Sequence, residues 1–366
     1  MKFAYFSHVW NRPEMAPSDR YDQLWRELAL ADELDFDYGF AVEHHFLPHE
    51  SWMTSPTVFC TGGALVTKKI RLGPMGYIAP LYDPIRILEE TAVLDNVLHG
   101  RLELGLVSGI VPEYYNHYTH FRDSRDETFE RRREMTLELV SLVKAAFADP
   151  EPFSFEGPFH QYKNVRLSVK TQQQPHPPMW IQSRDAPTLR FLAQEGVNTG
   201  YLLFFPRTEA APRYEEYLRL WKEAGHPQKP NNGYWTLVYV DETDELAVKK
   251  ATPHIAHAFS QVFGVGDAGF ENTERLIKNY ETRGEWGSAE IARNMANVEY
   301  LINHNLVFVG SPETVADRIK AAAAEGLFNT VFAEFNLGWL EEEDLMRSIK
   351  LFGEQVIPRI RDFQPY

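Results

Sequence analysis

The sequence predicts a (β/α)8 (TIM) barrel that fills residues 1–366 as one domain, with an inserted hairpin and a mobile excursion after strand seven. Strand-like and helix-like stretches alternate from end to end in eight principal β–α units, and no linker divides them. Strands separated by helices form a parallel sheet with right-handed crossovers. An open doubly wound sheet is the alternative fold, but no Gly-x-Gly-x-x-Gly turn follows the first strand.

The expected strands are short apolar stretches that could be covered on both faces, as parallel strands are. They span residues 2–7, 37–46, 70–79, 102–107, 179–182, 197–203, 234–240 and 330–335, with a stub at 306–309. The helices between them show apolar stripes, prolines in the first turn or acidic first turns. They span residues 21–34, 56–66, 84–98, 126–147, 214–224, 311–326 and 341–358, and a further helix is opened by the turn at 183–185 and runs to residue 195.

Two stretches depart from this alternation. Residues 153–169 alternate between apolar and polar side chains and contain Gly157-Pro158, which predicts a hairpin between a helix and the next strand. Residues 242–305 are the least regular region. Within it, residues 264–293 are rich in glycine and charge, so we expect an excursion from the barrel.

Composition excludes several classes of function. The net charge of −15 makes nucleic acid and anionic membranes poor partners, because both favour basic surfaces. Cys60 is the only cysteine, so no internal disulfide can form. No stretch of about 20 apolar residues occurs, and the amino terminus lacks the apolar core of a signal peptide. We therefore expect a cytoplasmic protein.

Reactive side chains follow four of the predicted strands. Because parallel strands of a barrel end at one mouth, these groups indicate a candidate active site there. They are Ser7-His8, Glu43-His44-His45, Met75-Gly76-Tyr77, and Ser108-Gly109 with Glu113. The alternative for the second group is a helix cap or a structural ion pair.

A metal centre is not expected. Adjacent His44 and His45 point opposite ways on an extended chain, and Pro48 opposes a helix that would join His45 to His49. No His-Glu-x-x-His pattern occurs, and the Gly-x-Ser-x-Gly elbow of Ser-His-Asp hydrolases is also missing.

A phosphate site is predicted after strand five, where Ser183, Arg184 and Thr188 surround a helix start. Ordinary capping by Ser183 or Asp185 is the alternative. Aromatic residues near the mouth would suit a flat apolar ligand. They are Trp10, Trp52, Tyr77, Tyr82, Tyr201, Phe204 and Trp339.

Several motifs together resemble the bacterial luciferase-like, flavin-dependent monooxygenases. They lie at residues 42–46 (VEHHF), 72–109 (from LGPMGYIAP to GLVSG), 175–196 (PHPPMWIQSRD onward) and 309–319 (VGSPETVADRI). The resemblance implies a barrel that takes reduced FMN from a separate reductase. It implies reaction with dioxygen and transfer of one oxygen atom to a small apolar substrate, such as an aldehyde, a terpene or ketone, or an organosulfur compound. It also implies a homodimer.

The resemblance also implies roles for single residues. His44 would perform acid–base catalysis beside the reactive carbon of the flavin, with Glu43 and His45 orienting it. Met75–Gly76, followed by Tyr77, would lie beneath the flavin ring and contain a non-proline cis peptide bond. Residues 264–293 correspond to a mobile lid.

The phosphate contacts implied by the resemblance are those of Ser108, Arg184, Asp185 and Thr188, beside Gly109 and Ser183. Luciferase has arginine where this chain has Ser108 and glutamate where it has Arg184, so the positive charge changes strands. Three alternatives stay open: a relative that transfers hydride with a deazaflavin coenzyme, a flavin-binding protein without turnover, and a metal hydrolase on a barrel.

Overall fold

The computed structural model describes the whole chain except residues 13, 49, 110–116, 119–127, 149–151 and 264–269. Its centre is formed by eight parallel strands. In order around the ring they are β1 (Lys2–Ser7), β2 (Tyr38–Ala41), β3 (Arg71–Pro74), β5 (Leu104–Val107), β8 (Met179–Trp180), β9 (Thr199–Leu202), β10 (Asn232–Val240) and β12 (Thr330–Glu334).

The pairing of these strands closes the ring. Parallel ladders join β1 to β2, β2 to β3, β5 to β8, β9 to β10, and β10 to β12. Single bridges complete the series, since Leu72–Leu102 links β3 to β5 and Trp180–Asn198 links β8 to β9. Because β12 pairs with β1 again, the predicted (β/α)8 barrel is confirmed.

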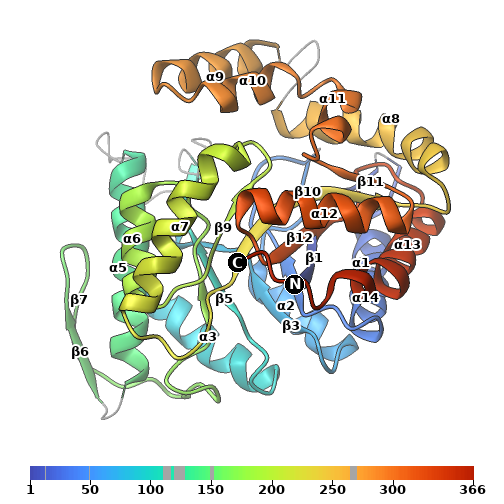
Figure 1. Ribbon diagram of the computed structural model, residues 1–366. Coiled ribbons are helices and arrows are strands. Elements are labelled where there is room, and N and C mark those ends of the chain that lie inside the picture. Colours follow the sequence, from blue (N-terminus) through green and yellow to red (C-terminus); the bar gives the residue numbers. More distant parts are fainter. Residues whose placement is uncertain (13, 49, 110–116, 119–127, 149–151, 264–269) are drawn as a thin grey trace.

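Helices follow the strands and surround the ring (Figure 1). Local signals explain where they begin: Asp83, Thr128, Asp185 and Ser311 each cap a helix by accepting a backbone N–H bond. The barrel helices are α1 (Pro17–Glu33), α2 (Pro56–Val66), α3 (Pro84–Val97), α5 (Phe129–Phe147), α6 (Ala186–Glu195), α7 (Arg207–Glu223), α12 (Pro312–Gly326) and α13 (Glu342–Leu351). The last continues through a π-turn, η3 (Phe352–Val356), into α14 (Ile357–Ile360).

The third strand is not continuous as predicted for residues 70–79. It divides into β3 and β4 (Tyr77–Ile78), which is followed by the short 3-10 helix η1 (Ala79–Leu81). Glycines let the backbones of β3 and β5 approach closely here, because a Cβ on Gly76 would lie 2.4 Å from the carbonyl carbon of Gly105. The close approach that these glycines permit is therefore to a neighbouring strand.

The hairpin is confirmed as β6 (Phe153–Glu156) and β7 (Gln161–Val165), an antiparallel pair at one side of the barrel (Figure 1). The expectation that residues 242–305 are irregular is wrong for most of that region. It forms α8 (Asp244–Phe263), α9 (Phe270–Thr282), α10 (Trp286–Arg293) and α11 (Val298–Asn303). These helices form an arm outside the barrel ring (Figure 1). Residues 264–269 of the predicted excursion lie outside the described part of the chain.

The stub at 306–309 is the short strand β11 (Phe308–Gly310), which pairs in parallel with the carboxyl end of β10. Among the described helices, none combines the length and the apolar character that crossing a bilayer requires.

Candidate active site

Three strand ends bring titratable side chains together at the barrel mouth. His8 directly follows β1, His44 comes three residues after β2, and Glu334 ends β12. Strand pairing sets Phe6 opposite Glu334 and Ser7 opposite Ala41, so these ends are neighbours in the ring. The mouth predicted from the order of strands and helices is therefore a real cluster of side chains.

His8 is buried and tied to Glu334. The Nδ1 atom of His8 lies 2.7 Å from Oε2 of Glu334, and the backbone N–H of His8 donates to the same carboxyl group at 3.2 Å. Burial and the charge of His44 lower the pKa of His8 to about 3, so this imidazole is neutral at physiological pH. Burial raises the pKa of Glu334 as well.

Aromatic rings enclose His8. Its ring centre lies 5.5 Å from that of Trp10 and 5.4 Å from that of Trp235, and Trp235 in turn lies 6.3 Å from Phe204. Trp235, on β10, was not among the predicted aromatic residues because it sits inside a wholly buried strand. Tyr201 was predicted at the mouth, but its hydroxyl donates to Gly326 O at the end of α12.

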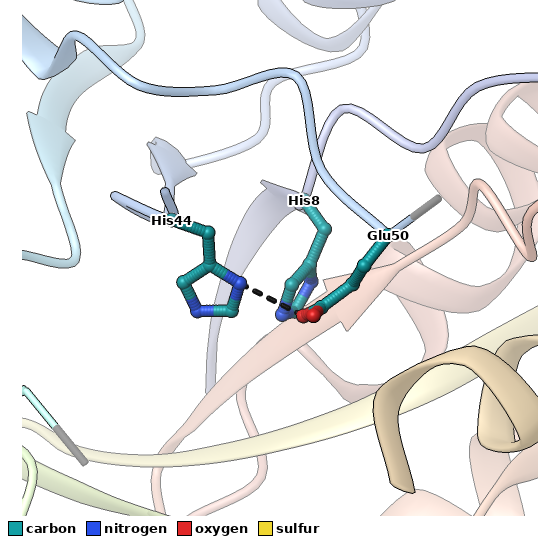
Figure 2. Close-up of side chains that lie close together, drawn as sticks. All are labelled: His8, His44 and Glu50. Carbon is teal, nitrogen blue, oxygen red and sulfur yellow. Dashed lines mark ion pairs between the residues drawn. The ribbon is translucent and has the colours of Figure 1, made fainter. Parts of the chain in front are cut away.

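His44 pairs with a carboxylate that the sequence did not single out. Its Nδ1 atom lies 2.8 Å from Oε1 of Glu50, and its ring centre lies 5.2 Å from that of His8 (Figure 2). The His44 side chain is 24% exposed whereas that of Glu50 is 6% exposed. Burial acts to raise the pKa of Glu50, but the charge and hydrogen bond of His44 outweigh it and the pKa lies below its usual value.

Glu43, which was expected to orient His44, is bonded to three other groups. Its carboxylate accepts bonds from Ile78 N–H at 2.7 Å and from the Tyr82 hydroxyl at 2.6 Å, and it pairs with His45 Nε2 at 2.9 Å. His45 also contacts the Tyr118 hydroxyl, 3.2 Å from Nδ1. This pair therefore fixes β4 and η1 against β2, and Glu50 is the carboxylate seen to pair with His44.

The segment predicted to lie beneath the flavin has the predicted backbone. The Met75–Gly76 peptide bond is cis, as the resemblance implied. Tyr77 is buried, and its hydroxyl lies 2.9 Å from Thr57 of α2, so its side chain is directed to the surrounding helix. Contacts from this segment to a bound ring would come from Met75 and the backbone.

The residues predicted for phosphate binding lie at neighbouring strand ends, with several polar groups already engaged. The hydroxyl of Ser108 donates to Thr136 at 3.1 Å, and Gly109 has a positive φ of 63°. Asp185 caps α6 by accepting from the N–H and hydroxyl of Thr188, at 3.0 and 2.7 Å. The alternative reading of Asp185 as an ordinary cap is thus correct.

Arg184 reaches from the barrel mouth to the arm. It forms an ion pair with Glu285 at 3.0 Å and contacts the Ser288 hydroxyl at 3.4 Å, and its guanidinium lies 5.2 Å from the ring centre of Tyr280. The Ser183 hydroxyl accepts the Asp185 N–H at 3.1 Å. The predicted excursion therefore contacts a strand end beside the candidate site.

Two amide groups at the strand ends mark where a ligand could bind. Nε2 of Gln182, after β8, and Oδ1 of Asn336, after β12, are buried and have no hydrogen-bond partner among the described residues. Unpaired buried polar atoms are costly, so a ligand with carbonyl acceptors and N–H donors would satisfy them. The isoalloxazine ring of a flavin carries both kinds of group, so these residues fit that cofactor.

The cluster of His8, His44 and Glu50 could also bind a cation. One donor atom each from His8, His44 and Glu50 lies within 4.8 Å of the others (Figure 2). The direct pairing of His44 with Glu50 accounts for two of the three groups without an ion. The expectation of no metal stays a prediction.

Sequence comparisons agree with the motif-based interpretation. The sequence model of the family described as luciferase-like monooxygenase matches residues 1–330. The oxygenase component of flavin-dependent trigonelline monooxygenase from Acinetobacter baylyi is 26% identical over 330 residues, which covers 89% of this chain and 87% of that protein. The uncharacterized protein y4wF of Sinorhizobium fredii is 28% identical over 198 residues, and the alignment spans about half of each protein (54% of this chain and 55% of that one).

Structural comparisons show the same fold. The oxygenating constituent of 3,6-diketocamphane monooxygenase from Pseudomonas putida, in complex with FMN, has a TM-score of 0.75 at 20% identity, covering 98% of this chain and 99% of that one. The coenzyme F420-dependent tetrahydromethanopterin reductase of Methanopyrus kandleri has a TM-score of 0.64 at 18% identity, covering 98% of both chains. With nine-tenths of the chain matched by one family model, this protein belongs to the luciferase-like monooxygenase family.

Proposed function

We propose that the protein is a flavin-dependent monooxygenase that uses reduced FMN, received from a separate flavin reductase, and dioxygen to oxygenate a small apolar substrate. The observation that carries this proposal is His44, an imidazole at the barrel mouth with one ring nitrogen paired to a buried carboxylate. The other ring nitrogen is turned away from Glu50 (Figure 2). A ring nitrogen directed away from the paired carboxylate can accept or donate a proton.

The bound flavin would supply the reaction with dioxygen, and the protein supplies binding, orientation and proton transfer. His44 would hold or accept a proton at Nε2 beside the reacting atoms. Met75 and the Gly76 backbone would support the ring, and the unpaired amides of Gln182 and Asn336 would bind its polar edge. These assignments follow from the residues that remain available at the strand ends.

The phosphate of FMN would bind near Ser108 and Gly109 on one side and Ser183, Arg184 and Thr188 on the other. Asp185 would hold the helix start and stay outside the phosphate contacts, because its carboxylate is negative and caps α6. The arm that carries Glu285 contacts Arg184, so it is suitably placed to act as the lid that shields the reaction from water.

The substrate would be apolar or aromatic, because Trp10 and Trp235 pack against His8 and Phe204 packs against Trp235. A long-chain aldehyde, a terpene or cyclic ketone, and an organosulfur compound fit this lining. We expect the enzyme to act in the cytoplasm.

A homodimer is the expected assembly. Apolar side chains are exposed on two adjacent helices: Val58 and Leu65 on α2, and Val93 and Val97 on α3. Leu65 is 84% exposed, and covering it together with its apolar neighbours would remove a larger apolar surface from water. Light scattering of the purified protein would check the assembly.

A deazaflavin coenzyme is the second candidate, because the coenzyme F420-dependent tetrahydromethanopterin reductase shares the fold. The two candidates differ in a direct titration with FMN and with the deazaflavin coenzyme. We expect FMN to bind. With a generic flavin reductase, NADH and a panel of apolar substrates, we expect an oxygenated product. Flavin binding without oxygen consumption would instead support a non-catalytic flavin-binding protein, and preference for the deazaflavin would refute the monooxygenase assignment.

A further inference from the structure

We propose that Glu50 is a positioning residue that holds His44 in one tautomer, with the proton on Nδ1 facing the carboxylate and Nε2 directed to the reacting atoms. This inference deepens the proposed function and rests on it for the catalytic role of His44. Glu50 lies six residues beyond His44, outside every motif that the sequence analysis singled out.

The short separation between the two groups favours one position of the proton. At 2.8 Å between His44 Nδ1 and Glu50 Oε1, an unprotonated nitrogen would set its lone pair against a negatively charged oxygen. The contact is favourable only when Nδ1 carries a proton. In the neutral imidazole, Nε2 is then the unprotonated nitrogen and can accept a proton.

Glu50 is held rigidly enough to orient another side chain. Its backbone N–H donates to Leu47 O at 3.0 Å, which closes the turn that carries it. The next residue, Ser51, donates its hydroxyl to His8 O at 2.6 Å, and the following N–H of Trp52 donates to Val9 O at 3.4 Å. The Glu50 loop is thereby tied to the end of β1.

The His44 backbone is fixed to the same loop. Its N–H donates to Met53 O at 2.9 Å, so the chain on both sides of Glu50 is anchored. A ring and a carboxylate that are both held by their backbones lose little further freedom when they pair. The arrangement is typical of an orienting group in an active site.

His8 cannot replace Glu50 in this role. Its Nδ1 atom is engaged by Glu334 at 2.7 Å, and its ring lies edge-on to His44, with planes 70° apart. A neutral imidazole in that position has no negative charge to offer the His44 proton. His8 is anchored by Glu334, and the carboxylate of Glu50 faces His44 (Figure 2).

The first experiment reads the tautomer directly, in the full-length protein without added flavin. Histidine is labelled with ¹⁵N, and the His44 nitrogen signals are assigned by their loss in His44→Asn. At alkaline pH, where imidazole is neutral, we expect the wild type to carry the proton on Nδ1. In Glu50→Leu we expect that preference to be lost, and in Glu50→Gln, which keeps an acceptor oxygen, to be largely restored.

The second experiment measures turnover and FMN affinity of the same variants. We expect Glu50→Leu to lower product formation about tenfold or more, in line with the contribution of a positioned acid–base group, and Glu50→Gln to recover part of it. FMN affinity should stay within about twofold of the wild type, since Glu50 pairs with His44 after β2, whereas the predicted phosphate contacts follow β5 and β8. The matched control is Glu138→Gln, which alters a His–Glu pair at 2.9 Å near the β6–β7 hairpin, and should change neither readout.

Three results would overturn the inference. The first is a wild-type His44 protonated on Nε2. The second is Glu50→Leu with the wild-type tautomer and wild-type turnover. The third is a stoichiometric metal in the purified protein whose removal by EDTA abolishes turnover, because the His8–His44–Glu50 group would then be a metal centre. Failure of the wild type to bind FMN would instead refute the proposed function, while the tautomer measurement would still test Glu50.

Discussion

The two ends of the barrel use buried charge in different ways. At the amino-terminal ends of the strands, Asp32 accepts three backbone N–H bonds, from residues 68, 69 and 70, at 2.7–3.0 Å. Asp37 accepts the Phe3 N–H at 2.8 Å and pairs with Arg361 at 2.6 Å. These carboxylates tie loops and the carboxyl-terminal segment to the barrel.

At the carboxyl ends, the side chains pair mainly with other titratable side chains. His8 pairs with Glu334 and His44 with Glu50, so groups that can carry a proton are held against each other there. The contrast agrees with the general division of a barrel into a stabilising face and a reactive face. It predicts that substitutions at the two ends separate stability from activity, and the predictions below test that separation.

The largest expected effect is on activity at the mouth. We expect His44→Ala to lower product formation by about 10²–10⁴-fold, the usual contribution of a positioned acid–base group. FMN affinity should change little, and turnover is measured at a temperature at which the variant is folded, because the substitution leaves the buried Glu50 carboxylate without His44. His160→Asn, beside the hairpin, is the matched control and should retain full activity. A His44→Ala enzyme as active as the wild type would remove the proposed role.

The barrel and its mouth could be predicted from sequence because they depend on local signals. The strand at residues 234–240 and the cap at Ser311 follow from apolar patterning and capping chemistry within a few residues. Glu50 could not be found that way. Its position depends on Ser51 and Trp52 meeting the end of β1, about 43 residues earlier in the chain, and no local pattern records that contact.

For the arm, local sequence signals predicted too little regular structure. Glycines and charges at residues 264–293 favoured an irregular excursion, but α9 and α10 form there as amphipathic helices. The predicted phosphate site was only partly predictable, because the sequence cannot show that Arg184 pairs with Glu285, 101 positions later in the chain.

Glu43 tests the comparison most severely, because it lies at the mouth but is bonded like a residue of the opposite end. We expect Glu43→Gln to lower the free energy of unfolding by about 1.5–3 kcal/mol, the value of a hydrogen bond to a charged group. The cause is the weakened hold on Ile78 N–H and Tyr82. Chemical denaturation would measure the change. A stable Glu43→Gln protein that had lost only activity would place Glu43 with the reactive groups after all.

Asp32 provides the converse test at the amino-terminal end. Burial acts to raise its pKa, but bonds from the backbone N–H groups of Ile70, Lys69 and Lys68 outweigh it, and the pKa lies below the usual value. A carboxyl group whose pKa is lower in the folded state stabilises the fold above its unfolded pKa, and this contribution is lost as the pH falls through the folded pKa.

We therefore expect Asp32→Asn to lower the free energy of unfolding by about 1–2 kcal/mol at neutral pH. The difference from the wild type should shrink as the pH falls below about 4. Denaturation curves at several pH values would measure it. Turnover at a temperature where both proteins are folded should be unchanged, and a large loss of turnover would contradict the separation of the two ends.

The smallest expected effect concerns FMN affinity and Arg184, which follows β8 and pairs with Glu285 of the arm. Arg184→Ala removes a charge-assisted contact to the phosphate worth about 1.5–3 kcal/mol. In the wild type, FMN binding must first break the Arg184–Glu285 ion pair, which is worth about 0–1 kcal/mol. We expect roughly tenfold weaker FMN binding, measured by quenching of flavin fluorescence. Arg190→Ala on α6, which alters a surface pair with Glu216 of α7, is the control.

Glu285→Gln should act in the other direction. It removes the competitor for Arg184, so FMN should bind a few-fold more tightly, by no more than the pair itself contributes. Opposite signs for Arg184→Ala and Glu285→Gln would show that the arm and the phosphate compete for one guanidinium. Weaker FMN binding in both variants would mean that the arm supports the bound cofactor through the Arg184–Glu285 pair. Arg184 would then act as a structural residue, like Asp32 and Asp37 at the other end of the barrel.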